Sequence, residues 1–259
     1  MRLTVDRLST QIGAQRIIND INMEIEQGAF VGVIGPNGSG KSTILKNIYR
    51  LLKPDSGVIT INDEDIAKMS SREVAQKMAV VSQETAVQFD FSVKEIVFMG
   101  RSPHKGWLDP DTDTDRKIVD YALKRVGLNG YSNKSFLSLS GGEKQRVLIA
   151  RAIAQQANIY ILDEPTNHLD IHHQLQVMDI AKNLEITVLA ALHDINLAAY
   201  YCDKLYVVQN GSIVASGMPE EVLTESLLME VFRVHSNIEI HTVTGKVHVT
   251  FFPETLLRR

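Results

Sequence analysis

Gly35-Pro36-Asn37-Gly38-Ser39-Gly40-Lys41-Ser42-Thr43 follows an apolar run, Ala29 to Ile34, and opens a segment with a helical pattern, Thr43 to Leu52. This order of strand, G-x-x-x-x-G-K-[ST] and helix is typical of a phosphate-binding P-loop. The glycines let the backbone form a concave nest of N–H donors, and the helix N-terminus adds more donors. Lys41 supplies positive charge for the β- and γ-phosphates, and the Ser42 hydroxyl can ligate Mg²⁺. A glycine-rich turn that merely happens to carry a lysine is the weaker interpretation, because the flanking strand and helix are both in place.

The bulk composition is that of an ordinary globular protein. The 259 residues, 44% hydrophobic and 22% charged, suffice for one large α/β domain or two small ones. The net charge of −4 gives no global indication of nucleic-acid binding. Cys202 is the only cysteine, which suits a reducing compartment. The N-terminus lacks the apolar core of a signal peptide, and no apolar run approaches the roughly 18 residues of a membrane span. We therefore expect a cytosolic protein. If it works at a membrane, a partner must hold it there.

Two kinds of strand pattern predict an α/β fold. Alternating segments predict half-buried antiparallel strands near the N-terminus, at Leu3 to Leu8, Ile21 to Ile25 and Val58 to Ile61. Continuous apolar runs predict the buried strands of a mostly parallel sheet, at Val31 to Ile34, Ile159 to Leu162, Val188 to Leu192 and Leu205 to Val208. Helical patterns separate the later runs, at Glu143 to Gln155, Ile171 to Leu184 and Asp194 to Tyr201.

The middle of the chain predicts an inserted helical subdomain, at about residues 85–155. Its helical segments follow one another without an intervening strand, at Ser92 to Met99, Asp115 to Val126 and Gly142 to Gln155. Ser92 with Glu95 three residues later forms a capping-box pattern that predicts a helix start.

A pair of acids follows the buried run Ile159 to Leu162. Parallel α/β sheets place their ligands at the carboxyl ends of strands, which is where Asp163 and Glu164 would lie. Asp163 suits the role of a Walker-B acid, which belongs to the Mg²⁺ shell. Glu164 suits the role of a base that deprotonates an attacking water. The alternative is a solvated strand end, which the P-loop upstream disfavours.

Leu139-Ser140-Gly141-Gly142-Glu143-Lys144-Gln145-Arg146 is a second glycine-rich stretch that opens a helix. A serine hydroxyl, glycine amides and a helix N-terminus again suit an anion. The stretch resembles the signature motif of ATP-binding-cassette (ABC) ATPases, and the resemblance extends over essentially the whole chain. It implies one ABC nucleotide-binding domain over residues 1–259, with ATP and Mg²⁺ as ligands.

Several further residues match motifs of that family. Gln83 matches the Q-loop, which touches Mg²⁺ and the attacking water; the stretch Asn167-His168-Leu169-Asp170 matches the D-loop; and His193 matches the switch histidine at the γ-phosphate. A satisfied polar residue would be the ordinary interpretation of a lone histidine after a strand. In the family, Ser140, Gly141 and Gly142 contact ATP held by the opposite subunit, so the resemblance implies a homodimer with two shared sites.

Ile12 departs from the family pattern. Within Leu8 to Gly13 it stands where an aromatic residue usually stacks on adenine. Isoleucine offers apolar contact but no π-stacking. Stacking of an aromatic side chain is worth about 1–3 kcal/mol per base. We therefore expect weaker adenine discrimination.

Two stretches resemble importer ATPases for iron chelates, haem and cobalamin, at Phe91 to His104 and Thr166 to Leu175. The ferric-siderophore type is the first expectation, with haem and cobalamin importers as alternatives. The resemblance implies integral-membrane permease subunits as partners, a substrate-binding protein acting indirectly, and a peripheral position on the cytoplasmic face of the membrane. It implies no nucleic-acid partner and no direct contact with the cargo. Val87, Phe89 and Phe91 either line the groove for the permease or pack in the core.

The histidines invite a metal interpretation. His168 and His172 lie four residues apart, but no carboxylate or cysteine completes a closed set, so a structural role is favoured. The chain should end in a β-hairpin at about residues 236–252, where a two-residue Thr244-Gly245 turn would place His241 opposite His248. Such a pair can bind a metal weakly, although ordinary surface polar residues are the commoner outcome.

Two other functions remain as alternatives. A soluble ABC protein acting on ribosomes or DNA would usually carry two cassettes or long coiled coils, and this chain shows neither pattern. A regulatory module that binds ATP without hydrolysing it conflicts with the presence of Glu164 and His193.

Overall fold

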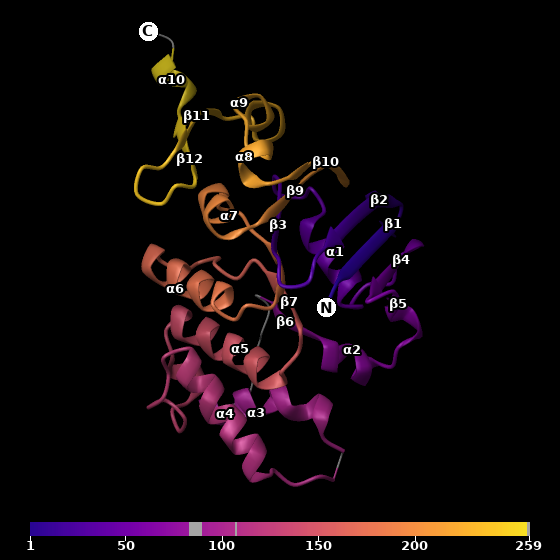
Figure 1. The fold of residues 1–259 in the computed structure, drawn as a ribbon, viewed down its shortest axis with the longest axis vertical. Helices are drawn as coiled ribbons and strands as arrows, with labels where there is room; N and C mark the ends of the chain where they lie inside the picture. Colours follow the sequence, from indigo (N-terminus) through magenta and orange to yellow (C-terminus); the bar gives the residue numbers. More distant parts are fainter. Residues whose placement is uncertain (83–89, 107, 258–259) are drawn as a thin grey trace. The chain divides into compact units, whose positions relative to one another are not determined.

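The computed structural model describes residues 1–82, 90–106 and 108–257 (Figure 1). The chain divides into two compact units. The first, called here the P-loop unit, comprises Met1–Asp65 and Leu189–Arg259; the second, called the helical unit, comprises Ile66–Val188. The predicted helical subdomain at about residues 85–155 falls within the helical unit.

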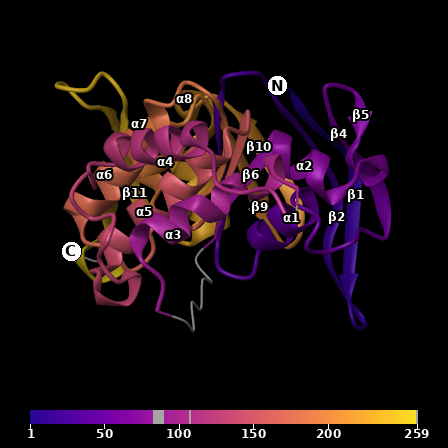
Figure 2. The ribbon, with the colours of Figure 1, turned by 90° about the horizontal axis from the view of Figure 1, so that it is seen from below.

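An antiparallel sheet opens the P-loop unit. Its strands lie in the order β2-β1-β4-β5, with bounds β1 (Leu3–Ile12), β2 (Gln15–Ile25), β4 (Ser56–Ile61) and β5 (Glu64–Asp65). The strands β1 and β2 form a long antiparallel pair (Figure 2). Between them lies Gly13, whose φ of +62° suits glycine. Leu3, Leu8 and Ile21 lie fully buried on one face, as the alternating pattern predicts. The antiparallel strands are confirmed, and the first two extend beyond their predicted ends.

The buried strands of the P-loop unit carry the loop itself. They follow the order β10-β9-β3-β8, with bounds β3 (Phe30–Ile34), β8 (Thr187–Ala191), β9 (Lys204–Gln209) and β10 (Ser212–Gly217). The strands β3 and β9 pair in parallel, whereas β9 and β10 form an antiparallel hairpin. Every residue of β3 and β8 is buried, which explains their continuous apolar composition. Helix α1 (Lys41–Ile48) follows β3, and α7 (Ile195–Tyr201) follows β8, whose first two residues belong to the helical unit.

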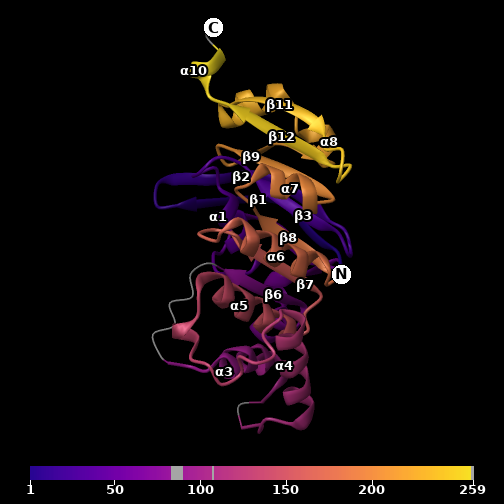
Figure 3. The same cartoon turned by 90° about the vertical axis from the view of Figure 1, so that its left-hand side faces the viewer.

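The C-terminal segment adds short helices and a hairpin (Figure 3). In chain order these are α8 (Pro219–Val222), α9 (Glu225–Leu227), η4 (Leu228–Phe232), β11 (His235–Ile240), β12 (Val247–Phe252) and α10 (Glu254–Leu257). Asn196 on α7 receives the N–H of Val249 at 2.8 Å and donates to its carbonyl oxygen at 3.0 Å. The Asn196 amide thus makes the same two bonds to the Val249 backbone that a residue of a neighbouring antiparallel strand would make, and so attaches β12 to α7.

The predicted turn of this hairpin is wrong, and so is the pairing of its histidines. The strand register pairs Glu239, rather than His241, with His248. Hydrogen bonds from His241 N to Lys246 O and from Gly245 N to His241 O, both 2.8 Å, close a wider turn. The two histidine rings still lie in edge contact across the strands, with centroids 5.7 Å apart. The wider turn shifts the register by two residues and so keeps both side chains on one face.

The helical unit contains one parallel strand pair and most of the helices. The strands are β6 (Met78–Ser82) and β7 (Ile159–Asp163). The helices are η1 (Ile66–Lys68), α2 (Ser71–Lys77), α3 (Val93–Phe98), η2 (Met99–His104), α4 (Asp113–Arg125), η3 (Phe136–Ser138), α5 (Gly141–Gln155) and α6 (Ile171–Lys182). The predicted Ser92–Glu95 capping box is present, and α2, α4 and α5 begin with the same device. The predicted helices are confirmed with small differences in their ends.

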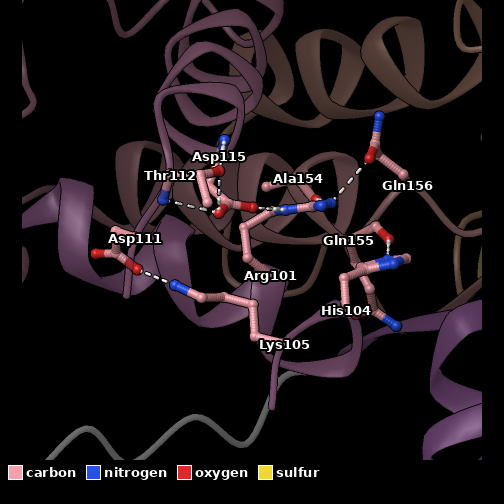
Figure 4. A network of polar contacts seen from close by, with 9 residues as sticks. All are labelled: Arg101, His104, Lys105, Asp111, Thr112, Asp115, Ala154, Gln155 and Gln156. Carbon is pink, nitrogen blue, oxygen red and sulfur yellow. Dashed lines mark hydrogen bonds and ion pairs between the residues drawn. The ribbon is translucent and has the colours of Figure 1, made fainter. Parts of the chain in front are cut away.

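A buried ion pair joins η2, α4 and the end of α5 (Figure 4). The Arg101 guanidinium donates from Nε to Asp115 at 2.9 Å, and from Nη1 to Ala154 O and Gln156 Oε1, both at 2.8 Å. The other oxygen of Asp115 caps α4 by accepting bonds from the Thr112 N–H and hydroxyl. Both members of the ion pair have side chains that are 8% exposed. One arginine therefore connects three helical segments of this unit.

Candidate functional site

The P-loop has the backbone that its glycines predict. Gly35, Gly38 and Gly40 have φ values of +155°, +75° and +108°, a region that favours glycine. At Gly35 a Cβ atom would lie 2.1 Å from the carbonyl oxygen of Val208 on β9, so a side chain is also excluded by contact. Around Gly38 no other atom lies within 4 Å of that position, so this part of the loop faces open space.

Lys41 is the buried cation of the loop. Its side chain reaches back over the P-loop, and Nζ donates to Gly35 O at 2.8 Å and Pro36 O at 3.1 Å. A buried ammonium needs such acceptors. Ser39 is also buried, and its hydroxyl has no hydrogen-bond partner among the described residues. The loop therefore combines a positive charge with an unsatisfied hydroxyl, while Pro36, Asn37 and Gly38 remain at least partly exposed.

The turn between β9 and β10 hydrogen-bonds to the P-loop, a contact that the sequence did not predict. Gly211 donates its N–H to Ser39 O at 2.9 Å and accepts the Asn19 N–H at 2.8 Å. A Cβ at Gly211 would lie 2.3 Å from Ile17 O, so only glycine allows this approach. The Asn210-Gly211 dipeptide between two apolar runs is a hairpin signal that would have found the turn. Nothing in the sequence indicates that the turn lies against the P-loop.

A buried polar pair attaches α1 to β1. The Thr10 hydroxyl donates to Asn47 Oδ1 at 3.0 Å, and the Asn47 amide donates to Thr43 O at 2.7 Å. Ile12 lies two residues further along β1 at its end, with 51% of the residue exposed. An apolar side chain so exposed offers contact to a flat apolar group such as a base.

His193 lies at the same end of the sheet as the start of the P-loop. The N–H of Leu192 donates to Val33 O at 3.0 Å, so the residue after Leu192 lies alongside the residues that lead into the loop. His193 is exposed, and Asp194 caps α7 by accepting the Leu197 N–H at 2.9 Å. Within the P-loop unit, His193 therefore follows a strand that ends beside the strand leading into the P-loop.

The acid pair lies at the end of β7 in the helical unit. Asp163 is buried as the last residue of this strand, and Glu164 follows with φ of +54°. A non-glycine residue in this region costs about 1–3 kcal/mol, and such residues gather at functional sites. The Asn167 amide donates to Glu164 Oε2 at 2.5 Å, which orients the carboxylate.

The predicted Q-loop residue Gln83 lies outside the described residues, as do Val87 and Phe89. Ser82, which precedes Gln83, pairs with Asp163 in the parallel register of β6 and β7. Phe91 is described and half-buried, and its carbonyl oxygen accepts the Phe136 N–H at 2.8 Å.

The signature serine is the N-cap of α5. Ser140 Oγ donates to Glu143 Oε2 at 2.9 Å and accepts the Glu143 N–H at 3.3 Å. Bonds from the N–H and hydroxyl of Ser140 hold the pKa of Glu143 below its usual value. The serine hydroxyl is thus directed at Glu143, and it must turn away to donate to another anion. Gly141 is exposed on the first turn of the helix, whereas Gly142 is buried.

The D-loop, Asn167 to Asp170, closes at the start of α6. Asp170 caps this helix, since its Oδ1 accepts the His173 N–H at 2.9 Å and contacts His173 Nδ1 at 2.8 Å. These bonds hold the pKa of the exposed Asp170 carboxyl below its usual value. In the part of the chain that the structure describes, no three His, Cys, Asp or Glu side chains form a cluster able to hold a metal ion. His168 and His172 accordingly belong to no such cluster.

The residues 18–167 match the family model described as ABC transporter, and this range exceeds half of the chain. The chain belongs to the ABC transporter family. Among curated relatives of this ABC chain, the cobalamin import ATP-binding protein of Halobacterium salinarum is 40% identical over 98% of the chain. The chain spans only 64% of that relative's length. The petrobactin import ATP-binding protein FpuC of Bacillus anthracis is 41% identical, with 93% of this chain and 89% of the relative covered. The hemin import ATP-binding protein of Thermobifida fusca is 39% identical, with 92% and 84% covered.

Solved structures agree with this membership. An inward-facing ABC transporter assigned to the metal-chelate type matches with a TM-score of 0.85 and 27% identity, and 98% of each chain is covered. The ATP-binding cassette MJ1267 in its ADP conformation matches with a TM-score of 0.81 at 24% identity, which supports the fold alone. None of the helices in the described part of this ABC chain is long and apolar enough to cross a bilayer.

Proposed function

We propose that this chain is the ATP-binding and ATP-hydrolysing subunit of an ABC importer that energises uptake of an iron complex, most specifically a ferric siderophore. The observation that carries the proposal is the set of relatives with 35–41% identity over nine-tenths of the chain or more. They are named as ATP-binding proteins of petrobactin, iron(3+)-hydroxamate, hemin and cobalamin import, or of a probable siderophore transport system. Haem and cobalamin are therefore the alternative cargoes. The cargo passes through a permease and does not touch this subunit.

The proposed ATP contacts of the P-loop follow from its geometry. Phosphate oxygens would receive the loop N–H groups and the donors at the N-terminus of α1. Lys41 would exchange its bonds to Gly35 O and Pro36 O for bonds to the β- and γ-phosphates. The buried hydroxyl of Ser39 lies in the same loop and has a donor to offer. Ile12 would contact the adenine, and His193 would contact the γ-phosphate.

The predicted Mg²⁺ ligands fit this ion chemically. Mg²⁺ prefers hard oxygen donors and keeps several waters, so it needs few protein ligands. Ser42 offers a hydroxyl at the start of α1, and Asp163 offers a buried carboxylate at the end of β7. Gln83 is the third predicted ligand. When bound with ATP, Mg²⁺ neutralises phosphate charge.

Glu164 is the proposed general base. Its backbone lies in the left-handed region, and the Asn167 amide donates a hydrogen bond to one carboxylate oxygen. The carboxylate would accept a proton from an attacking water, which is the role of a positioned carboxylate in hydrolysis. Ser140, Gly141, Gly142 and Asp170 would contact the ATP of a second copy, so hydrolysis requires a homodimer.

The proposed setting is the cytoplasmic face of the membrane. The chain would attach there to integral-membrane permease subunits, and a substrate-binding protein would act on the same permease without contacting this chain. No nucleic acid takes part. ATP binding would close the dimer, hydrolysis would open it, and the permease would receive the movement.

Phosphate release by the purified chain and by Glu164→Gln tests the catalytic part. We expect the variant to bind ATP normally, to lose turnover by about 10²-fold or more, and to accumulate as an ATP-bound dimer. Glu220→Gln, an exposed carboxylate on α8, is the matched control and should behave as the wild type. Normal turnover by Glu164→Gln would refute the assignment of the base, and a wild type without turnover would refute the ATPase.

Co-expression with the permease tests the cargo. Uptake of ferric siderophores, haem and cobalamin is measured in cells that carry the complex with either the wild type or Glu164→Gln. We expect siderophore uptake that the variant abolishes. Uptake of haem or cobalamin alone would move the assignment to that alternative.

A further inference from the structure

We propose that His173 is a positioning residue that joins the D-loop to the signature glycines of the same chain. Through this side chain, two stretches that are predicted to face the partner's ATP would hold one fixed arrangement. The identity of the ligand rests on the proposed function, whereas the joint itself rests on contacts within the helical unit.

The first contact is the His173 ring on Gly142. A Cβ atom at Gly142 would lie 2.0 Å from His173 Cδ2, 2.4 Å from Cγ and 2.8 Å from Nε2. Gly142 lies within α5 and has no positive φ, so its backbone conformation does not demand glycine. Alanine would favour the helix by about 1 kcal/mol at such a position. The histidine ring therefore excludes a side chain at Gly142.

The second contact comes from the D-loop itself. Leu169 Cδ2 lies 3.7 Å from the position of a Cβ at Gly141, an ordinary van der Waals distance. The two consecutive signature glycines thus face two residues that lie four apart, one in the D-loop and one in the first turn of α6. The contact at Gly141 leaves room for a methyl group, and the contact at Gly142 does not.

The orientation of the His173 ring is set from behind by Asp170. Nδ1 lies 2.8 Å from Asp170 Oδ1, and the same oxygen accepts the backbone N–H of His173. An ionised carboxylate only accepts hydrogen bonds, so Nδ1 carries the hydrogen. With Nδ1 held in this way, the Cδ2 corner of the ring faces Gly142. The exposed ring of His172 meets the His173 ring edge-on at a centroid distance of 5.3 Å, and the described atoms nearest to a Cβ at Gly141 or Gly142 do not include it.

These contacts place one imidazole between two helix starts. Ser140 caps α5, and Asp170 caps α6. The His173 ring contacts Gly142, two residues after Ser140, and hydrogen-bonds to Asp170. A displacement of about 1 Å in a group that binds the reacting phosphate can cost about 10²-fold in rate. Loss of the ring should therefore loosen the first turn of α5 and impair hydrolysis, without a change in the P-loop, which lies in the other unit.

Two substitutions separate the contacts of His173. His173→Phe keeps a ring over Gly142 and loses the bond to Asp170, whereas His173→Asn keeps a donor near Nδ1 and loses the ring edge. We expect both to lower the maximal rate of ATP hydrolysis about tenfold or more, with the affinity of the isolated chain for a fluorescent ATP analogue within about twofold of wild type. His172→Phe and His172→Asn are the matched controls and should leave both quantities unchanged.

Hydrogen exchange of the nucleotide-free chain gives a readout that does not depend on ATPase activity. We expect the amides of the first turn of α5 to exchange about threefold faster or more in His173→Asn than in His172→Asn. Unchanged exchange in His173→Asn would refute the positioning role of His173. A parallel fall of nucleotide affinity and hydrolysis would also refute it, because such a fall marks general destabilisation. A wild type that does not hydrolyse ATP would refute the proposed function. The positioning role of His173 would then be judged from the hydrogen-exchange result alone.

Discussion

Replacing Arg101 by methionine should destabilise the helical unit strongly. Methionine keeps much of the buried aliphatic volume and removes the guanidinium, so the loss is electrostatic rather than a cavity. Asp115 would lose its charged partner at 2.9 Å, and Ala154 O and Gln156 Oε1 would each lose a bond of 2.8 Å (Figure 4).

The expected loss is about 3 kcal/mol. Removing one partner of a buried ion pair costs roughly 3–5 kcal/mol, because the remaining charge is left buried without compensation. The lower end applies here, since Asp115 keeps its bonds from the Thr112 N–H and hydroxyl. For a chain of this size that corresponds to a fall of about 6–12 °C in the unfolding midpoint.

The pH dependence gives a second, independent expectation. Bonds from Thr112, followed by those from Arg101, lower the pKa of Asp115 to about 2 from 3.8. A carboxyl with a depressed native pKa stabilises the fold above its unfolded pKa, and this contribution is lost as pH falls from 3.8 toward 2. Arg101→Met should weaken this acid dependence without abolishing it, because the Thr112 cap remains.

Urea unfolding followed by circular dichroism, at neutral pH and at about pH 3, measures both effects. The control is Arg116→Met, which removes an exposed pair with Asp113 whose side chains are 58% and 88% exposed. That variant should change stability by no more than about 0.5 kcal/mol. A cost below about 1 kcal/mol for Arg101→Met, or one no larger than that of Arg116→Met, would show that the Arg101–Asp115 pair does not stabilise the helical unit.

Three further substitutions test the P-loop unit. Gly35→Ala should lower ATP affinity about tenfold or more, because its Cβ would lie 2.1 Å from a carbonyl oxygen of β9; an effect no larger than that of Gly38→Ala, where the space is open, would contradict this. Ile12→Tyr should strengthen ATP binding by about 1–3 kcal/mol through stacking, measured by titration calorimetry, and an unchanged affinity would show that Ile12 does not face the base. Asn196→Ala should accelerate hydrogen exchange at Val249, since two bonds of 2.8 and 3.0 Å to β12 are lost; protection equal to wild type would mean that β12 is held by packing alone.

The local features of the site could be predicted from the residues alone. The nest of the P-loop, the left-handed glycines and the capped starts of α3 and α5 depend on residues within a few positions of one another. The burial of β3 and β7 is likewise visible in their composition, because a strand covered on both faces must be apolar throughout. The motif order then carried the expectation of an ABC fold, which family membership confirms.

The contacts between residues that are distant in the chain could not be predicted from the sequence. The register of the C-terminal hairpin differs from the simplest turn prediction, and Asn196, some 50 residues upstream, bonds directly to its second strand. Gly211 lies beneath Ser39, and the His173 ring occupies the space beside Gly142. A side chain would clash with Ile17 O at Gly211 and with His173 at Gly142. No local pattern names these neighbours, because packing depends on which surfaces the fold brings together. The signature stretch was therefore visible in the sequence, while the histidine that excludes a side chain from its second glycine became visible only in the fold.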